Sequence, residues 1–253
     1  MDLTTILLLG IVALLGGFID AIAGGGGMLV MPALLSIGMP PHLVVGTNKL
    51  VGTFGTLSAS VTFIRKGLFQ PALWWAMSFG TLVGALLGAV LIYLLSAGTL
   101  KTLLPLAILL ASGYLIWPRR TPPAQAMPRP EATPTGRRGV KLLTGGLIGF
   151  YDGFIGPGTG AFWMAAAMKL FHLDLVAAAG VARFMNFVSN LTALLTFVIL
   201  GNIDYTVGLT MGATLMLGAF VGAHSAIRYG APFIRPVFLL VVALMAGRLL
   251  LAA

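Results

Sequence analysis

The sequence predicts an all-α polytopic membrane protein that contains two repeats of inverted topology. Hydrophobic residues make up 58% of the chain and charged residues only 8%, whereas soluble domains carry about 25% charged residues. Several apolar runs reach the roughly 18 residues that a membrane-spanning helix needs. The second half of the chain repeats the layout of the first. Because lipid offers the backbone no hydrogen bonds, these runs must be helices.

The apolar segments define the expected elements in order. The first half contains apolar segments at residues 3–22, 28–37, 43–64, 72–95 and 100–117. The second half contains them at residues 140–155, 161–171, 175–200, 206–227 and 233–251. Between the halves the chain is rich in Pro and Arg and lacks apolar periodicity, which is typical of a disordered linker. We therefore divide the chain into an N-terminal repeat (1–117), a linker (118–139) and a C-terminal repeat (140–253).

A constant separation connects matching residues of the two halves. Gly84 and Gly218 lie 134 positions apart within a shared G-A-x-x-G-A pattern. Further pairs at this separation are Gly46 with Gly180, Lys49 with Arg183, Gly67 with Gly201, Lys101 with Arg235, and Gly113 with Gly247. Near the start of each half the separation is 132 positions, which pairs Asp20 with Asp152. So many coincident glycines and charges indicate an internal duplication.

Basic residues predict the orientation, because Lys and Arg collect in cytoplasmic loops. The region of the linker carries Arg119, Arg120, Arg129, Arg137, Arg138 and Lys141. If this region lies on the cytoplasmic side, then Arg65 and Lys66 lie on that side too. Arg228 also lies there if residues 140–171 form a hairpin that enters and leaves the membrane on the cytoplasmic side. We therefore predict a broken-helix hairpin plus three transmembrane helices in each half. This odd number of crossings inverts one half relative to the other, as in many secondary transporters. Lys101 falls outside, against the rule.

Composition and motifs narrow the function classes. The net charge of +9 is explained by the cytoplasmic loops, so we expect no nucleic-acid partner. The chain has no cysteine, which excludes disulfides and thiolate metal sites. It also lacks a serine-nucleophile motif, a P-loop and paired carboxylates on one helix, and its three histidines do not have metal-ligand spacing. We therefore expect no cofactor, no metal and no enzymatic activity.

Two acids lie inside the apolar segments. Asp20 and Asp152 each precede a glycine-rich break by four residues. An ionisable group within the membrane is costly, so it is a functional candidate. Each carboxylate could cap backbone amides at the break or pair with a buried cation. Alternatively, it could couple transport to protons or cations. The sequence leaves both roles open.

The glycine-rich breaks are candidates for an anion site. Each is followed by a short apolar segment, which begins near Met28 or Ala161. The N-terminus of a helix offers free N–H groups and the positive end of its dipole. Inverted repeats would bring two such ends together at the membrane midplane. The expected substrate-binding residues here are Gly24, Gly25, Gly26, Gly27, Gly156, Gly158, Thr159 and Gly160. The alternative is that the glycines only permit a tight hairpin turn.

Polar residues on two long apolar segments form the remaining candidates. They are Thr47, Asn48 and Lys49 in the first half, and Arg183, Asn186 and Asn190 in the second. Asn186 and Asn190 share one helix face because they are four residues apart. Lys49 and Arg183 could supply positive charge to an anion or could extend to the membrane surface. The amides could line the anion path or join helices.

These motifs together resemble the TauE/SafE family of sulfite exporter-type membrane proteins. The resemblance rests on "GGFIDAIAGGGGMLVMPALLSIGMPPHLVVGTNKL" in the first half and on "GFYDGFIGPGTG" and "ARFMNFVSN" in the second. It covers nearly the whole chain apart from the linker. It implies a bacterial or archaeal inner-membrane transporter of small anions with sulfur or carboxylate groups, such as sulfite, sulfoacetate or other organosulfonates. The second half departs from the T-x-K pattern at residues 181–183, which read V-A-R and lack the hydroxyl.

The residues and the resemblance lead to the same expectation. An anion binds near the midplane between the hairpin tips, with Lys49 or Arg183 supplying charge, and one repeat rocks against the other. The expected partners are a small anionic substrate and the lipid bilayer. The sequence does not decide whether the protein forms a homo-oligomer. The expected location is the bacterial inner membrane, with the linker in the cytoplasm. The alternatives are a passive anion channel and, with less support from the motifs, an intramembrane enzyme.

Overall fold

The computed structural model describes residues 2–116, 138–230, 232–233 and 236, and it is entirely helical in this part of the chain. The first half forms α1 (Leu3–Ala23), α2 (Gly27–Ser36), α3 (Pro41–Arg65), the 3₁₀ turn η1 (Pro71–Trp74), α4 (Trp75–Tyr93) and α5 (Ala97–Ile116). The second half forms α6 (Arg138–Phe154), α7 (Thr159–Phe171), α8 (Leu175–Leu200) and α9 (Tyr205–Tyr229). The predicted linker up to residue 137, most of the last apolar segment, and the counterparts Arg235 and Gly247 lie outside the described residues.

The two predicted helix breaks are present. α1 ends at Gly24, whose φ of 84° is a left-handed conformation that favours glycine. α6 is followed by Gly156 and Gly158, with φ of 89° and 76°. The short helices α2 and α7 begin one or two residues earlier than the sequence predicted. Each break therefore joins a long helix to a short one, as expected for a hairpin.

Four helical stretches of the described chain are long and apolar enough to cross a membrane. They are α1, η1 with α4 (Pro71–Tyr93), α8 and α9. α3 has 25 residues, but several hydroxyl and amide side chains make it more polar than these four. Large apolar side chains point outward, including Ile199 at 84% and Leu147 at 72% exposure. An outer surface of this kind fits a lipid environment.

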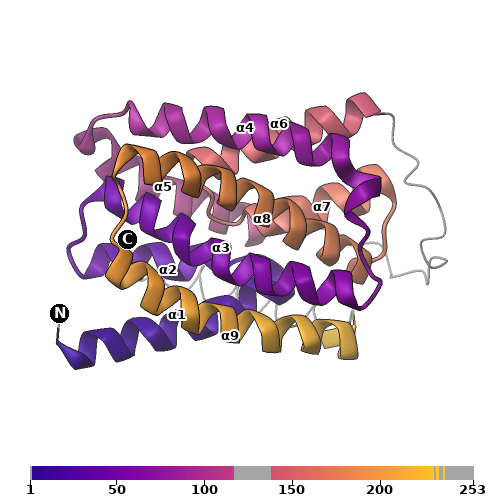
Figure 1. Cartoon of the computed structure of the whole chain (residues 1–253), viewed down its shortest axis with the longest axis horizontal. Helices are drawn as coiled ribbons and strands as arrows, with labels where there is room; N and C mark the ends of the chain where they lie inside the picture. Colours follow the sequence, from indigo (N-terminus) through magenta and orange to yellow (C-terminus); the bar gives the residue numbers. More distant parts are fainter. Residues whose placement is uncertain (1, 117–137, 231, 234–235, 237–253) are drawn as a thin grey trace.

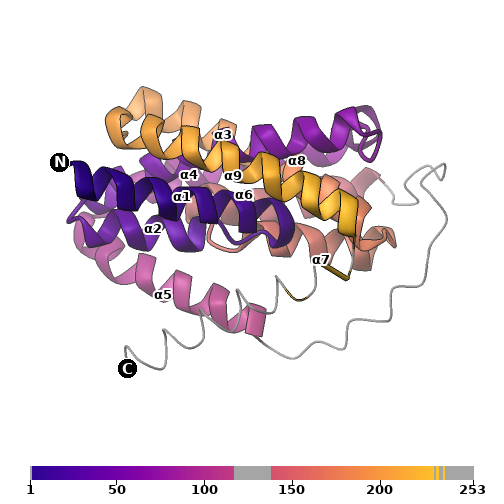
Figure 2. The ribbon, with the colours of Figure 1, turned by 90° about the horizontal axis from the view of Figure 1, so that it is seen from below.

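The helices lie side by side along the long axis of the molecule (Figures 1 and 2). α1 packs on α9, and α4 packs on α6. α3 and α8 contact each other, and they connect these two pairs, since α3 packs on α9 and α8 on α4. The most polar helix therefore lies beside α8, the helix that carries Arg183.

Glycines allow the outer helix pairs to approach closely. A Cβ atom added at Gly84 of α4 would overlap the carbonyl oxygen of Gly146 in α6, and one at Gly88 would overlap that of Phe150. Gly218 of α9 meets the carbonyl oxygen of Leu14 in α1 in the same way. The Gly-x-x-x-Gly pairs therefore serve helix packing, because small residues let membrane helices contact through their backbones.

We predict that Gly84→Ala destabilises the protein, whereas Gly146→Ala does not. The methyl group at Gly84 has no room, and such overpacking costs about 1–3 kcal/mol. At Gly146, on the facing helix, the nearest atom to an added Cβ is 3.9 Å away. The measurement is the thermal unfolding midpoint of each variant in detergent. Equal midpoints for the two variants would contradict this account of the interface.

Candidate functional site

The two hairpin tips touch each other at the centre of the molecule. A Cβ atom at Gly24 would lie 2.6 Å from the amide nitrogen of Ala161 and 2.7 Å from the Cα of Gly160. No side chain fits at this contact, so the two backbones meet directly. The tips come from segments more than a hundred residues apart in the chain. The expected convergence of the two breaks is therefore present.

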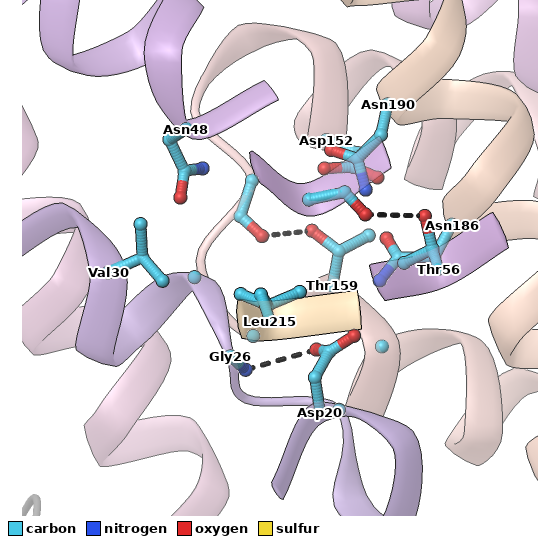
Figure 3. A pocket seen from close by; sticks show the side chains of 16 residues that line it. Asp20, Gly26, Val30, Asn48, Thr56, Asp152, Thr159, Asn186, Asn190 and Leu215 are labelled. Atoms are coloured by element: carbon cyan, nitrogen blue, oxygen red, sulfur yellow. Dashed lines mark hydrogen bonds between the residues drawn. The ribbon is translucent and has the colours of Figure 1, made fainter. Parts of the chain in front are cut away.

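A small polar cavity lies beside this contact (Figure 3). Its volume accessible to the centres of water molecules is about 30 Å³, which is room for roughly two of them. Two carboxylates, three amides and two threonines face it. The lining residues are Asp20, Gly24, Gly26, Gly27, Val30, Asn48, Gly52, Thr56, Asp152, Gly156, Gly158, Thr159, Gly160, Asn186, Asn190 and Leu215.

Most of the predicted site residues line this cavity. Those that do not are Gly25, Thr47, Lys49 and Arg183. Thr47 instead accepts a hydrogen bond from the amide of Asp204, at 2.9 Å, and so ties α3 to the start of α9. The Thr47 hydroxyl therefore contacts the loop before α9 and does not line the cavity.

Four lining residues were not predicted. Gly52 and Thr56 follow Asn48 at intervals of four residues, so helical spacing could have identified them. Val30 lies one turn after Gly26 on the short helix α2. Leu215 belongs to the apolar helix α9, where no sequence signal separates a lining residue from its neighbours.

Lys49 and Asp152 form a buried ion pair between α3 and α6. The Nζ atom of Lys49 lies 2.8 Å from Oδ1 of Asp152, and the two side chains are 1% and 3% exposed. Lys49 also donates a hydrogen bond to the backbone carbonyl of Asp152. The hydroxyl of Ser189, on α8, donates to Oδ2 of Asp152. Both carboxylate oxygens of Asp152 therefore have a donor.

Arg183 and Asp20 form the corresponding pair between α8 and α1. Nη1 of Arg183 lies 3.3 Å from Oδ2 of Asp20, and the side chains are 0% and 12% exposed. Arg183 also donates to the backbone carbonyl of Asp20. Oδ1 of Asp20 accepts a hydrogen bond from the amide of Gly26 at 3.0 Å. Asp20 thus caps the glycine break and pairs with a buried cation, which are the two structural roles considered above.

Lys49 and Arg183 lie beside the cavity but do not line it. They do not extend to the membrane surface, because both are fully buried. Each pairs with a carboxylate of the other half, so the four charges of Lys49, Asp152, Arg183 and Asp20 balance. Within the described residues, no group of three His, Asp or Glu side chains is placed to hold a metal ion.

Comparison with known proteins assigns the chain to a family. The sequence model of the family described as "Sulfite exporter TauE/SafE" matches residues 9–249. The chain belongs to the TauE/SafE family. It is similar to "Probable membrane transporter protein YfcA" of Escherichia coli, with 36% identity over 96% of this chain and 90% of the relative. A "Probable membrane transporter protein" of Haemophilus influenzae is 37% identical over 94% of this chain and 91% of its own length.

A third relative, "Probable membrane transporter protein ORF9" of a Sinorhizobium species, is 39% identical over 95% of this chain and 90% of its own length. No solved structure gives a significant match. This TauE/SafE protein is therefore a multi-pass membrane transporter, with both glycine breaks inside the matched region. Thr47, the counterpart of Val181, contacts the amide of Asp204 and does not line the cavity.

We predict that Lys49→Met destabilises this TauE/SafE protein by about 3–5 kcal/mol, because it leaves the Asp152 carboxylate buried without its cation. Lys49→Met combined with Asp152→Asn should recover most of this loss, since Ser189 can still bond the amide. The measurement is the free energy of unfolding in a double-mutant cycle. Additive effects of the two changes would contradict a direct pair.

Proposed function

We propose that this TauE/SafE protein is a secondary transporter that moves a small anion across the bacterial inner membrane by alternating access. The substrate class is a sulfur-containing or carboxylate anion, of the sulfite, sulfoacetate or organosulfonate type. The observation that carries the proposal is the meeting of two helix N-termini at one buried polar cavity between the halves of the chain. The family description supports the sulfur oxyanion.

Helix dipoles favour an anion in the cavity. Residues at the starts of α2 and α7, the positive ends of these helices, line it. The opposite, negative helix ends of α1 and α6 are also close, but their carbonyls at Asp20 and Asp152 accept hydrogen bonds from the cations. Arg183 and Lys49 therefore satisfy carbonyls at the two negative ends, while the start of α7, and that of α2 apart from the Gly26 amide bonded to Asp20, can act on a ligand.

Amide side chains supply the remaining donors. Asn48 comes from α3, and Asn186 and Asn190 come from α8. The Oδ1 atom of Asn186 is buried and has no hydrogen-bond partner within the described residues. Since buried polar atoms are normally paired, this acceptor needs a donor such as a water molecule or a protonated ligand oxygen, whereas the Nδ2 group of the same amide can donate to an anion. An oxyanion would accept from the amide N–H groups.

The helix arrangement supports two inverted repeats. In Figure 1, α1 and α3 run from left to right, whereas their counterparts α6 and α8 run from right to left. The packing of α1 on α9 corresponds to that of α6 on α4. We propose that each half is a hairpin plus three transmembrane helices. Alternating access then arises when one repeat rocks against the other around the cavity.

The distribution of basic residues supports the proposed orientation. The end of α3, the starts of α4 and α6 and the ends of α7 and α9 lie on the right in Figure 1. These ends carry Arg65, Lys66, Arg138, Lys141, Lys169 and Arg228. The opposite end includes the 201–204 loop, which has no basic residue, and Lys101 is an exception there. By the positive-inside rule the right-hand end, with the linker, faces the cytoplasm.

We predict that a small anion raises the thermal midpoint of the purified protein at fixed ionic strength. The panel is sulfite, ethanesulfonate, sulfoacetate, thiosulfate and acetate, with chloride as the reference. A ligand at 100 times its Kd adds about 2.7 kcal/mol to the apparent stability. In proteoliposomes the same anion should show saturable uptake. Uptake that rises linearly with concentration and does not respond to any ion gradient would indicate the channel alternative instead.

We also predict that Asn186→Leu weakens anion binding without lowering the thermal midpoint. A hydrogen bond to a charged group contributes about 1.5–3 kcal/mol, so affinity should fall by roughly tenfold or more. Stability should hold, because leucine removes a buried oxygen that has no partner. The control is Asn202→Leu, whose amide donates to the carbonyl of Leu200 at the end of α8 and does not line the cavity. Unchanged affinity in Asn186→Leu would place the anion elsewhere.

A further inference from the structure

The two ion pairs at the cavity differ in how firmly the carboxylate is held. Asp152 has a donor on each oxygen, from Lys49 and from Ser189, and its side chain is 3% exposed. Asp20 has a backbone amide on one oxygen and a longer contact of 3.3 Å to Arg183 on the other, and its side chain is 12% exposed. Asp20 is thus the carboxylate that can change its partner.

The sequence itself creates this difference. The position 134 residues before Ser189 is Gly55, so α3 has no hydroxyl where α8 provides one. A side chain at Gly55 would collide with Leu215 of α9. The second donor that holds Asp152 therefore has no counterpart for Asp20.

Arg183 has hydrogen-bonding capacity that the described residues do not use. Its Nε and Nη2 atoms are buried and have no partner within the described part of the chain. Nη2 lies 2.7 Å from the position of a Cβ on Gly160, a residue of the cavity wall. The guanidinium group is thus separated from the cavity by a residue without a side chain. Because a guanidinium does not lose its proton in proteins, it always needs an anionic partner.

We propose that Asp20 is the proton-coupling residue of the transporter and that Arg183 exchanges Asp20 for the substrate anion. A proton from the open side binds the Asp20 carboxylate, and Arg183 then takes the oxyanion as its partner. When the anion leaves, Arg183 returns to Asp20 and the proton is released, so one proton moves with each anion. Lys49 and Asp152 stay paired throughout and hold the second hairpin. This inference rests on the proposed function.

The charged surroundings of Asp20 are simple. Arg183 of α8 is in direct contact, and Asp152 of α6 faces the same cavity with its partner Lys49 of α3 behind it. α2, α7 and α9 contribute no titratable side chain to the cavity wall in the described residues. A pH dependence of anion binding would therefore be assigned to Asp20 or Asp152, and the two can be separated by substitution.

The test measures the Kd of ethanesulfonate and of sulfite for the full-length protein from about pH 5 to about pH 8. Ethanesulfonate stays ionised over this range, and the protonation of sulfite cancels when variants are compared. For the wild type, we expect the Kd to rise by up to tenfold per pH unit, because one proton binds with each anion. Asp20→Asn imitates the protonated acid, so its Kd should not change with pH and should match the tightest wild-type value.

Variants of the other pair are the matched controls. Asp152→Asn should lose stability but keep the wild-type pH slope, and Ser189→Ala is the milder change that leaves the Lys49 contact in place. A wild-type slope in Asp20→Asn, or a lost slope in Ser189→Ala, would overturn the assignment to Asp20 while the proposed function stands. Wild-type protein that binds neither anion at any pH would overturn the proposed function itself.

Discussion

A helix that stops inside a membrane leaves backbone carbonyls without partners, and two buried cations solve this problem here. Arg183 donates to the carbonyl of Asp20 and forms an ion pair with its carboxylate, and Lys49 donates to both the carbonyl and the carboxylate of Asp152. Lipid cannot satisfy such groups. Lys49 and Arg183 therefore stabilise the ends of α6 and α1 at the two glycine breaks beside the cavity. The site therefore depends on these two contacts more than on any residue in its wall.

Close helix packing places these cations within reach. The backbone contacts at Gly84 and Gly218 bring the outer helices against each other, and α3 and α8 lie between them. A larger residue at either glycine would overlap the backbone of the facing helix and separate that helix pair. The small residues of the outer helices thus allow the close packing that surrounds the charged residues of the inner helices. Packing and electrostatics support each other in this arrangement.

The sequence predicted the helices, the two breaks and their meeting point, because a hydrophobic pattern and an internal repeat are visible in the residues themselves. It also singled out Asp20 and Asp152, which the structure places in the cavity wall at the two breaks. It did not predict that each acid pairs with the cation of the other half, since an offset shows which residues correspond and not which residues touch. For this reason Lys49 and Arg183 were expected in the cavity wall, whereas the structure places them behind it. Thr56 was missed because a helix hydroxyl ordinarily bonds its own backbone, as Thr56 does with Gly52 at 2.7 Å.

The exchange of cations between halves also constrains how the protein is made. When α1 to α5 have entered the membrane, Asp20 and Lys49 are both present, but neither has its final partner. Asp152 arrives with α6, and Arg183 arrives only with α8. More than half of the chain must therefore be synthesised before the Asp20 carboxylate can pair with Arg183. A first half on its own would hold Asp20 without Arg183, so each half of the duplication completes the buried charge pairs of the other.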